Sequence, residues 1–210
     1  MYYSSGALRD IEDPPVVEEI PSKSDQEIIT DCMGDTIIEL SENTLVRMDL
    51  PDVYYPGIDF TSSQPYEDYS CITNRRSAAY QITRSDNAYT DENGYRRYTT
   101  TDNQFTIDGE SDYVVALGTF YKPKGTCGSR FLVITSEGMY TIITGDEKDD
   151  RHTDEMNMFS RHGDNAGMIE FLVDSSTLYH ADNMAARMGS IHYSSIPELS
   201  GEILAMYRID

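Results

Sequence analysis

The stretch that decides the fold is Tyr140 to Asp154, YTIITGDEKDDRHTD, in which an apolar run ends at a glycine and a cluster of acids. This pattern predicts a β-strand that leads into a polar loop. A second short apolar run follows, Met168 to Val173, with one acid inside it, Glu170. Together the two runs predict neighbouring strands that bring carboxylates to one cleft.

Glu170 interrupts a strand that is otherwise apolar. Alternation along a strand places Glu170 on the same face as Met168 and Leu172, with the remaining apolar residues on the other face. A carboxyl in such a position loses solvation, which favours the protonated form that a general acid needs. Asp146, at the exit of the first strand, is the candidate for a second carboxyl. Two carboxyls in unlike environments are the usual machinery for cleaving a glycosidic bond.

Two structural readings stand beside this catalytic hypothesis. The acids after Thr144 could form an ordinary solvated turn, with Gly145 supplying backbone freedom. Glu170 could cap the rim of a barrel, or pair with Arg130 or Arg208.

The residues around this pair predict a mainly β fold. Asp174-Ser175-Ser176 offers a helix N-cap, and apolar residues then recur at helical spacing up to Gly189, which suits a helix C-terminus. We therefore expect a small six-stranded β-barrel with one amphipathic helix over about 175–188. The further segments with strand patterns are Tyr113 to Tyr121, Phe131 to Thr135, Met139 to Thr144, and Gly201 to Ile209.

The chain divides into three regions. Residues 1–80 are acidic, broken by prolines and rich in tyrosine, which predicts a tether or a loosely packed extension. Within it, Asp35 to Met48 fits either two short strands or a short helix. Residues 81–111 form a lead-in in which Asn93-Gly94 predicts a hairpin between Tyr89 and Tyr98. Residues 112–210 carry the barrel.

The composition excludes some partners. There are 37 Asp and Glu against 16 Lys and Arg, so the net charge is −21. Nucleic-acid binding needs clustered basic residues, and an anionic membrane surface would repel this chain. No apolar run is long enough to span a bilayer, and no signal peptide is visible. The oligomeric state is left open.

Cysteine and histidine give weaker signals. Cys32, Cys71 and Cys127 lack the spacing of a metal site, and either free thiols or a Cys32–Cys71 bridge would fit. Cys127 as a nucleophile, with a histidine as base, is a weak hypothesis. We expect no cofactor and no metal. If a metal were bound, the ligands in this polar stretch would be His152, Asp154 and His162.

From Val114 to Ile209 the order of features resembles the double-psi β-barrel of the 3D-domain proteins and their RlpA-like and MltA-like relatives. These are bacterial cell-wall proteins that include lytic transglycosylases. Ala116 to Tyr121 looks like the opening strand of that barrel, and Cys127 to Phe131 is similar to the P-L-G-T stretch. Gly145-Asp146 resembles the A-x-D-T-G turn. Two further stretches match as well, Gly167 to Phe171 with the K-G-x-x-I-D-L segment and Ala185 to Gly189 with the A-x-x-F-G helix end.

The resemblance implies an extracytoplasmic protein that binds, or also cleaves, peptidoglycan or another cell-envelope polysaccharide. Asp146 and Glu170 would be the catalytic carboxylates, and Gly128, Asp149 and Asp164 would contact the substrate. An alternative, favoured by the missing third carboxylate, is a non-catalytic surface, envelope or phage-tail module that has kept the barrel. The sequence departs from the family pattern in three ways at its acids. The residues after Asp146 are altered, the second aspartate is a glutamate, and the third carboxylate has no counterpart.

Overall fold

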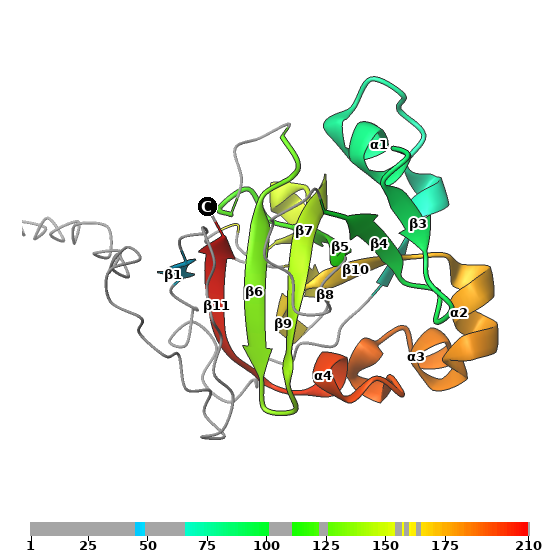
Figure 1. Cartoon of the computed structure of the whole chain (residues 1–210), viewed down its shortest axis with the longest axis vertical. Coiled ribbons are helices and arrows are strands. Elements are labelled where there is room, and N and C mark those ends of the chain that lie inside the picture. The colour runs from blue at the N-terminus through cyan, green and yellow to red at the C-terminus, as the bar shows by residue number, and fades with distance from the viewer. Residues whose placement is uncertain are drawn as a thin grey trace, which may run out of the picture.

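Nine strands form one mixed sheet in the computed structural model, which describes residues 45–48, 66–100, 111–121, 126–153, 157, 160–162 and 165–209 (Figure 1). The main path of the sheet runs β1-β11-β6-β7-β5-β10-β2, and β3 and β4 branch from β5. The strands of this sheet are β1 (Leu45–Met48), β2 (Tyr66–Asp68), β3 (Ala88–Thr90), β4 (Arg96–Thr99), β5 (Ser111–Leu117), β6 (Arg130–Thr135), β7 (Met139–Glu147), β10 (Glu170–Val173) and β11 (Ile203–Ile209).

The prediction of a mainly β fold is confirmed, but the described strands do not form the predicted six-stranded barrel. Their path is open, because β1 occupies one end by pairing antiparallel with β11, and β2 occupies the other by pairing parallel with β10. The predicted strand over Met168 to Val173 is also divided at Ile169. Its first part belongs to β9 (Asn165–Met168), which pairs with β8 (Ser160–His162) in a separate two-stranded sheet.

Strand β5 lies at the centre and has both faces covered. All seven of its residues are buried. Its odd-numbered positions, such as Val115, pack into the larger hydrophobic core, whereas Val114 and Ala116 pack into a second core on the opposite face. A strand that is buried on both faces needs a nearly continuous apolar run, which is what the sequence shows.

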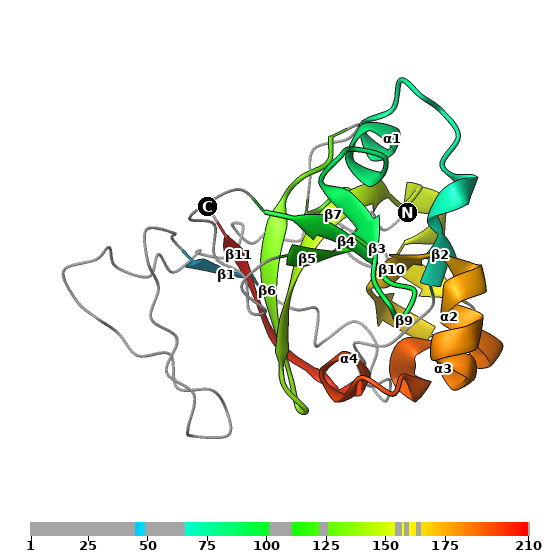
Figure 2. The ribbon, with the colours of Figure 1, turned by 45° about the vertical axis from the view of Figure 1, so that its right-hand side comes forward.

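The larger core is built on aromatic side chains. Tyr95, Tyr113 and Phe171 meet edge to face with ring centroids 5.6–6.0 Å apart, and Tyr140 joins them. Buried residues of the C-terminal helices, including Leu178, pack against this cluster, and Figure 2 shows these helices gathered on one side of the sheet. The helical segments there are α2 (Ser175–Ala181), α3 (Asn183–Met188), the 3-10 turn η3 (Ile191–Tyr193) and α4 (Pro197–Ser200).

The opposite face is covered by α1 (Ala78–Thr83), which begins at an N-cap where the Ser77 hydroxyl accepts the backbone N–H of Tyr80. Strand β7 approaches closely beneath α1. A Cβ atom added at Gly145 would lie 2.1 Å from Cγ1 of Val114 and 3.3 Å from Cγ2 of Ile82. Gly145 is therefore required mainly by the close approach of the Val114 side chain of β5, with α1 packed above it, and not for the freedom of a turn.

The predicted single helix over about 175–188 is wrong in one respect, because it is broken at Asp182 into α2 and α3. Both predicted ends are confirmed. The Asp174 carboxylate caps α2 by accepting the backbone N–H of Thr177, and Gly189 ends α3 with a left-handed φ of 62°. The break follows from the Asp182 side chain, which is buried and accepts hydrogen bonds from Ser194 Oγ (2.6 Å) and the backbone N–H of Ser195 (3.0 Å).

The predicted hairpin around Asn93-Gly94 is confirmed, since β3 and β4 pair antiparallel. Its connection is longer than a two-residue turn. The Asp91 carboxylate organises it by accepting the backbone N–H groups of Asn93 and Tyr95, and Gly94 adopts a φ of 91°. The predicted antiparallel pairing of Phe131 to Thr135 with the strand that follows is also present, in β6 and β7.

Part of the predicted N-terminal extension, residues 1–80, belongs to the sheet. Strands β1 and β2 come from it, and the 3-10 turn η1 (Tyr69–Cys71) and the start of α1 follow. The Tyr66 hydroxyl also donates to the carbonyl of Ala186 in α3. Residues 1–44 and 49–65 of the extension, which include most of Asp35 to Met48, lie outside the described residues. No described helix has both the length and the apolar character needed to cross a membrane.

Candidate functional site

The two predicted carboxylates lie in one row of the sheet. Ala116 of β5 pairs with Asp146 of β7 on one side and with Glu170 of β10 on the other. Directly opposed residues of neighbouring strands project to the same face, so Asp146 and Glu170 share a face with Ala116. Two inter-strand spacings separate their Cα atoms, about 10 Å.

A β-bulge sets this arrangement. The pairing of β5 with β7 passes from Val115–Thr144 directly to Ala116–Asp146, which leaves Gly145 unpaired. Such a bulge shifts the alternation of the strand by one position. Asp146 therefore points to the side of α1, where Gly145 would otherwise have stood. Asp146 is also a strand residue and not part of a loop, because β7 continues to Glu147.

Lys148 brings a positive charge to the row. Its backbone N–H donates to the carbonyl of Leu117 (3.0 Å), which extends the strand pairing beyond β7. Two positions after Asp146, its side chain points to the same face. The ammonium group forms a close ion pair with Glu170 and a longer one with Glu67, at 3.6 Å. We call Glu67, Asp146, Lys148 and Glu170 the carboxylate–lysine cluster.

Glu67, like Lys148, is a member of the cluster that the sequence analysis did not single out. It lies in β2, opposite Leu172 of β10. Its Oε2 atom is buried and has no hydrogen-bond partner, since the distance to Lys148 is too long for one. Burial raises the pKa of the Glu67 carboxyl; Lys148 lowers it, and the nearby charges of Asp146 and Glu170 raise it further. A strand of three residues is too short to give a periodic signal, so the sequence held no means of finding this residue.

The pKa of the Lys148 ammonium group is raised. Burial alone would lower it, but the charges of Glu170, Glu67 and Asp146 outweigh that effect. The amine consequently keeps its proton. A lysine that acts as a nucleophile needs a free amine, so the environment of Lys148 suits a counterion and not a Schiff-base residue.

The accessibility of the cluster decreases from Glu67 inward. The Glu67 side chain is 30% exposed, that of Lys148 is 16% exposed and that of Glu170 is 3% exposed. A general acid must come within hydrogen-bond distance of the atom that it protonates. Glu170 is covered and paired with an ammonium group, so it is poorly placed to protonate a bound sugar. Neither Arg130 nor Arg208 is the ion-pair partner found here: Arg130 pairs with Asp112 (2.6 Å), and Arg208 is exposed.

The predicted substrate-contacting residues are not gathered at the cluster. Gly128 has a φ of 102°, and its N–H donates to the carbonyl (2.8 Å) and hydroxyl (3.1 Å) of Thr144, on the edge of β7 away from β5. Asp149 is exposed and caps the 3-10 turn η2 (Asp150–His152). Hydrogen bonds from Arg151 lower the pKa of Asp149. Asp164 lies outside the described residues.

The weak metal candidates do not form a described site. His152 is exposed in η2, and Asp154 lies outside the described residues. His162 belongs to β8, where the structure describes the backbone alone. In the part of the chain that the structure describes, no group of three or more His, Cys, Asp and Glu side chains could hold a metal ion. In the carboxylate–lysine cluster the positive charge comes from Lys148.

The cysteines contribute little to this site. Cys71 is an exposed free thiol at the end of η1, and Cys127 is half-buried and packs against the second core beneath α1. Cys32 lies outside the described residues.

No family model, no curated protein and no solved structure matches this chain.

Proposed function

We propose that this chain is a non-catalytic module that binds a polysaccharide of the bacterial cell envelope, outside the cytoplasm. The observation that carries the proposal is the state of Glu170, whose side chain is 3% exposed and paired with Lys148. A buried ion pair is costly to break, because removing one partner leaves an uncompensated charge. The cluster therefore holds β10, β7 and β2 together and is not free to transfer protons to a sugar.

The class of ligand comes from the resemblance to double-psi β-barrel proteins of the cell wall. We propose further that the open sheet is a divergent form of that barrel. Two features support this: β5 and β7 pair in parallel around the β6–β7 hairpin, and Asp146 and Glu170 flank Ala116 on one face. In this proposal the fold and the placement of its acids have been kept, while Glu170 has become the ion-pair partner of Lys148.

Purified peptidoglycan tests the proposal. The full chain is incubated with the insoluble wall, the wall is sedimented, and both bound protein and soluble muropeptides are measured. We expect the protein to sediment with the wall and to release no muropeptides. Absence of binding would contradict the module hypothesis. If wild type releases muropeptides and the variants Asp146→Asn and Glu170→Gln do not, the proposal that the module is non-catalytic is contradicted.

A second function, cleavage of the glycan, is favoured by Glu67. Burial and the neighbouring carboxylates raise its pKa, and its side chain is the most exposed of the three that form the ion pairs. A raised pKa favours the protonated form of a carboxyl, which is the form that a general acid needs. Asp146, on the same face, would then stabilise positive charge at the anomeric carbon.

Glu67→Gln separates the two functions in the same assay. The amide has the shape of the acid but cannot give up a proton. If the chain is an enzyme that uses Glu67, muropeptide release falls by a factor of about 100 or more while wall binding is kept. If it is a binding module, wild type and Glu67→Gln sediment equally and neither releases product.

A further inference from the structure

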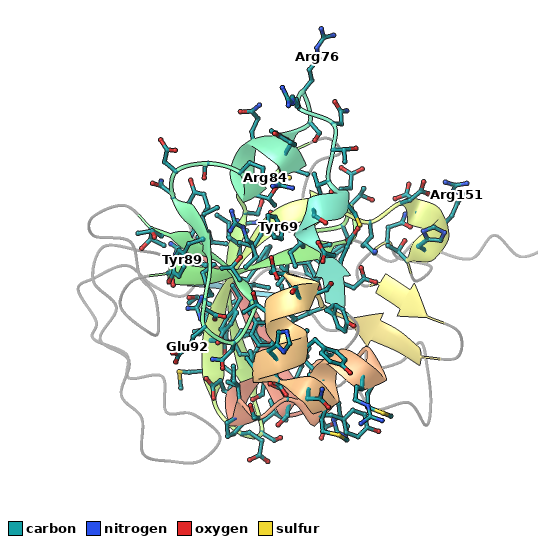
Figure 3. All side chains as sticks on the ribbon, turned by 90° about the vertical axis from the view of Figure 1, so that its right-hand side faces the viewer. Tyr69, Arg76, Arg84, Tyr89, Glu92 and Arg151 are labelled. Atoms are coloured by element: carbon teal, nitrogen blue, oxygen red, sulfur yellow. The ribbon has the colours of Figure 1, made fainter. Side chains whose placement is uncertain are left out.

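Two arginine side chains from different elements stack on one tyrosine. Arg84 is the C-cap residue of α1, and Arg96 lies in β4. The Cζ atom of each lies 4.5 Å from the ring centroid of Tyr69, and that of Arg84 lies 5.8 Å from the ring centroid of Tyr80. Figure 3 shows Arg84 and Tyr69 on the same side of the molecule, with Arg76 farther out at the tip of the preceding loop.

Neither arginine has a carboxylate partner among the described residues, although acids outnumber bases by 37 to 16 in the whole chain. The ion pairs of the described residues use other cations, such as Arg97 with Asp91, and Arg151 with Asp149. An arginine that stacks on tyrosine while acids are plentiful keeps its guanidinium edge available.

The hydrogen bonds give the two arginines different roles. Arg96 is 7% exposed and donates to the carbonyls of Thr83 and Ala88 and to the hydroxyl of Thr90, so it acts as a fixed positive charge. Arg84 is exposed, and its guanidinium donates a long hydrogen bond of 3.5 Å to the Tyr69 carbonyl. Because a guanidinium has five N–H donors, Arg84 can offer a bidentate pair to a ligand.

The electrostatics favour an incoming anion. Burial lowers the pKa of the Arg96 guanidinium, and the positive charge of Arg84 lowers it further. Tyr69 and Asp174 act in the opposite direction and raise it. Arg84 and Arg96 repel each other, and a negative charge bound beside them would offset this repulsion. A net charge of −21 repels long polyanions, so the fitting ligand carries an isolated charge on an otherwise neutral body.

We infer that Arg84, Tyr69 and Arg96 form a binding site for the carboxylate of an acidic sugar. The planar carboxylate matches the free edge of Arg84. The half-buried ring of Tyr80 beside it supplies an apolar surface for the C–H groups of a pyranose. The inference deepens the proposed function and rests on it for the sugar, whereas the anion specificity rests on the arginines alone.

A matched pair of sugars tests the site. N-acetylmuramic acid differs from N-acetylglucosamine by a lactyl ether that carries a carboxylate. Each is titrated into the full chain, and binding is followed by NMR chemical shifts of the backbone amides. We expect N-acetylmuramic acid to bind at least about tenfold more tightly, because hydrogen bonds to a charged group add that much. The shifted amides should cluster around Tyr69 and Arg84.

Three variants assign the binding to the stack. Arg84→Gln should weaken binding of N-acetylmuramic acid about tenfold or more. Arg84→Lys, which keeps the charge but loses the planar fork, should bind with an intermediate affinity. Arg76→Gln removes an equally exposed arginine away from Tyr69 and should bind as wild type does.

Equal binding of the two sugars, or equal loss in Arg76→Gln and Arg84→Gln, would overturn the inference. Running the wall assay beside the sugar titration distinguishes failure of this inference from failure of the proposed function. If walls bind wild type but the chain binds the two sugars equally, the acidic-sugar site is wrong and the binding module stands. If walls do not bind the chain but N-acetylmuramic acid binds through Arg84, the acidic-sugar site stands and the binding module is wrong.

Discussion

At the scale of single residues, the carboxylate–lysine cluster holds more negative charge than its one lysine can balance. This excess raises the pKa of the Glu67 carboxyl, because burial and the charges of Asp146 and Glu170 together outweigh the attraction of Lys148. A carboxyl with a raised pKa in the folded state stabilises the fold at low pH. That stability is complete below the unfolded pKa, about 4.5, and is lost as pH rises through the folded pKa.

We therefore predict that Glu67→Gln changes the pH dependence of stability. The amide is neutral at every pH, so the variant should gain stability relative to wild type as pH rises from 4 to 7. Thermal unfolding measured across this range checks the prediction. Glu92→Gln is the matched control, because Glu92 is exposed in the β3–β4 connection (Figure 3). A difference between wild type and Glu67→Gln that stays constant with pH would contradict the assignment.

The sequence could predict Asp146 and Glu170 as neighbours but not what lies between them. Alternation put Glu170 on the face opposite Phe171, and the structure has this arrangement, with Phe171 in the larger core. Lys148 escaped notice because it follows the predicted end of the strand. The strand pairing that aims it at Glu170 depends on the carbonyl of Leu117, which is distant in sequence. The bulge at Gly145 likewise depends on the partner strand.

At the scale of elements, Asp182 shows how one buried side chain overrides a local pattern. The helical spacing of apolar residues continues from α2 into α3, which is why the sequence predicts one helix. The backbone at Asp182 instead has φ −128° and ψ 69°, and its carboxylate holds Ser194 and Ser195. The Tyr95 hydroxyl lies 3.1 Å from Ser194 Oγ and so joins the same network. Tertiary hydrogen bonds of this kind leave no periodic trace in a sequence.

Removing this network should be costly. In Asp182→Ala the Ser194 hydroxyl and the Ser195 N–H lose a buried charged acceptor, and we expect the free energy of unfolding to fall by about 2–4 kcal/mol. Urea denaturation measures the change. Asn183→Ala, at the neighbouring exposed position of α3, is the control and should cost less than about 1 kcal/mol. A loss for Asp182→Ala as small as that of the control would show that the break in the helix has another cause.

At the scale of the whole molecule, charge opposes compaction. A chain of net charge −21 repels itself when folded, and the described ion pairs neutralise few of its acids. Salt screens such repulsion, because the Debye length falls from about 30 Å at 0.01 M to about 3 Å at 1 M. The fold should therefore be more stable at high ionic strength.

We predict that the midpoint of thermal unfolding rises by several degrees when sodium chloride is raised from low to near-molar concentration. Calorimetry or circular dichroism follows the transition. A parallel series in tetramethylammonium chloride checks that the rise follows ionic strength and not one cation. A midpoint that falls with salt would mean that the ion pairs contribute more than the net repulsion costs.

The place of β11 in the sheet has a consequence for how the chain reaches its fold. This strand follows every other strand in sequence, yet it lies between β1 and β6. While the chain is being synthesised, β1 has no partner and one edge of β6 stays unpaired until β11 has left the ribosome. An open apolar edge is a template for wrong pairing, so the nascent chain is exposed to aggregation until β11 has emerged and paired. Chaperone dependence and slow folding are then expected of this topology, because its pairings join segments far apart in sequence.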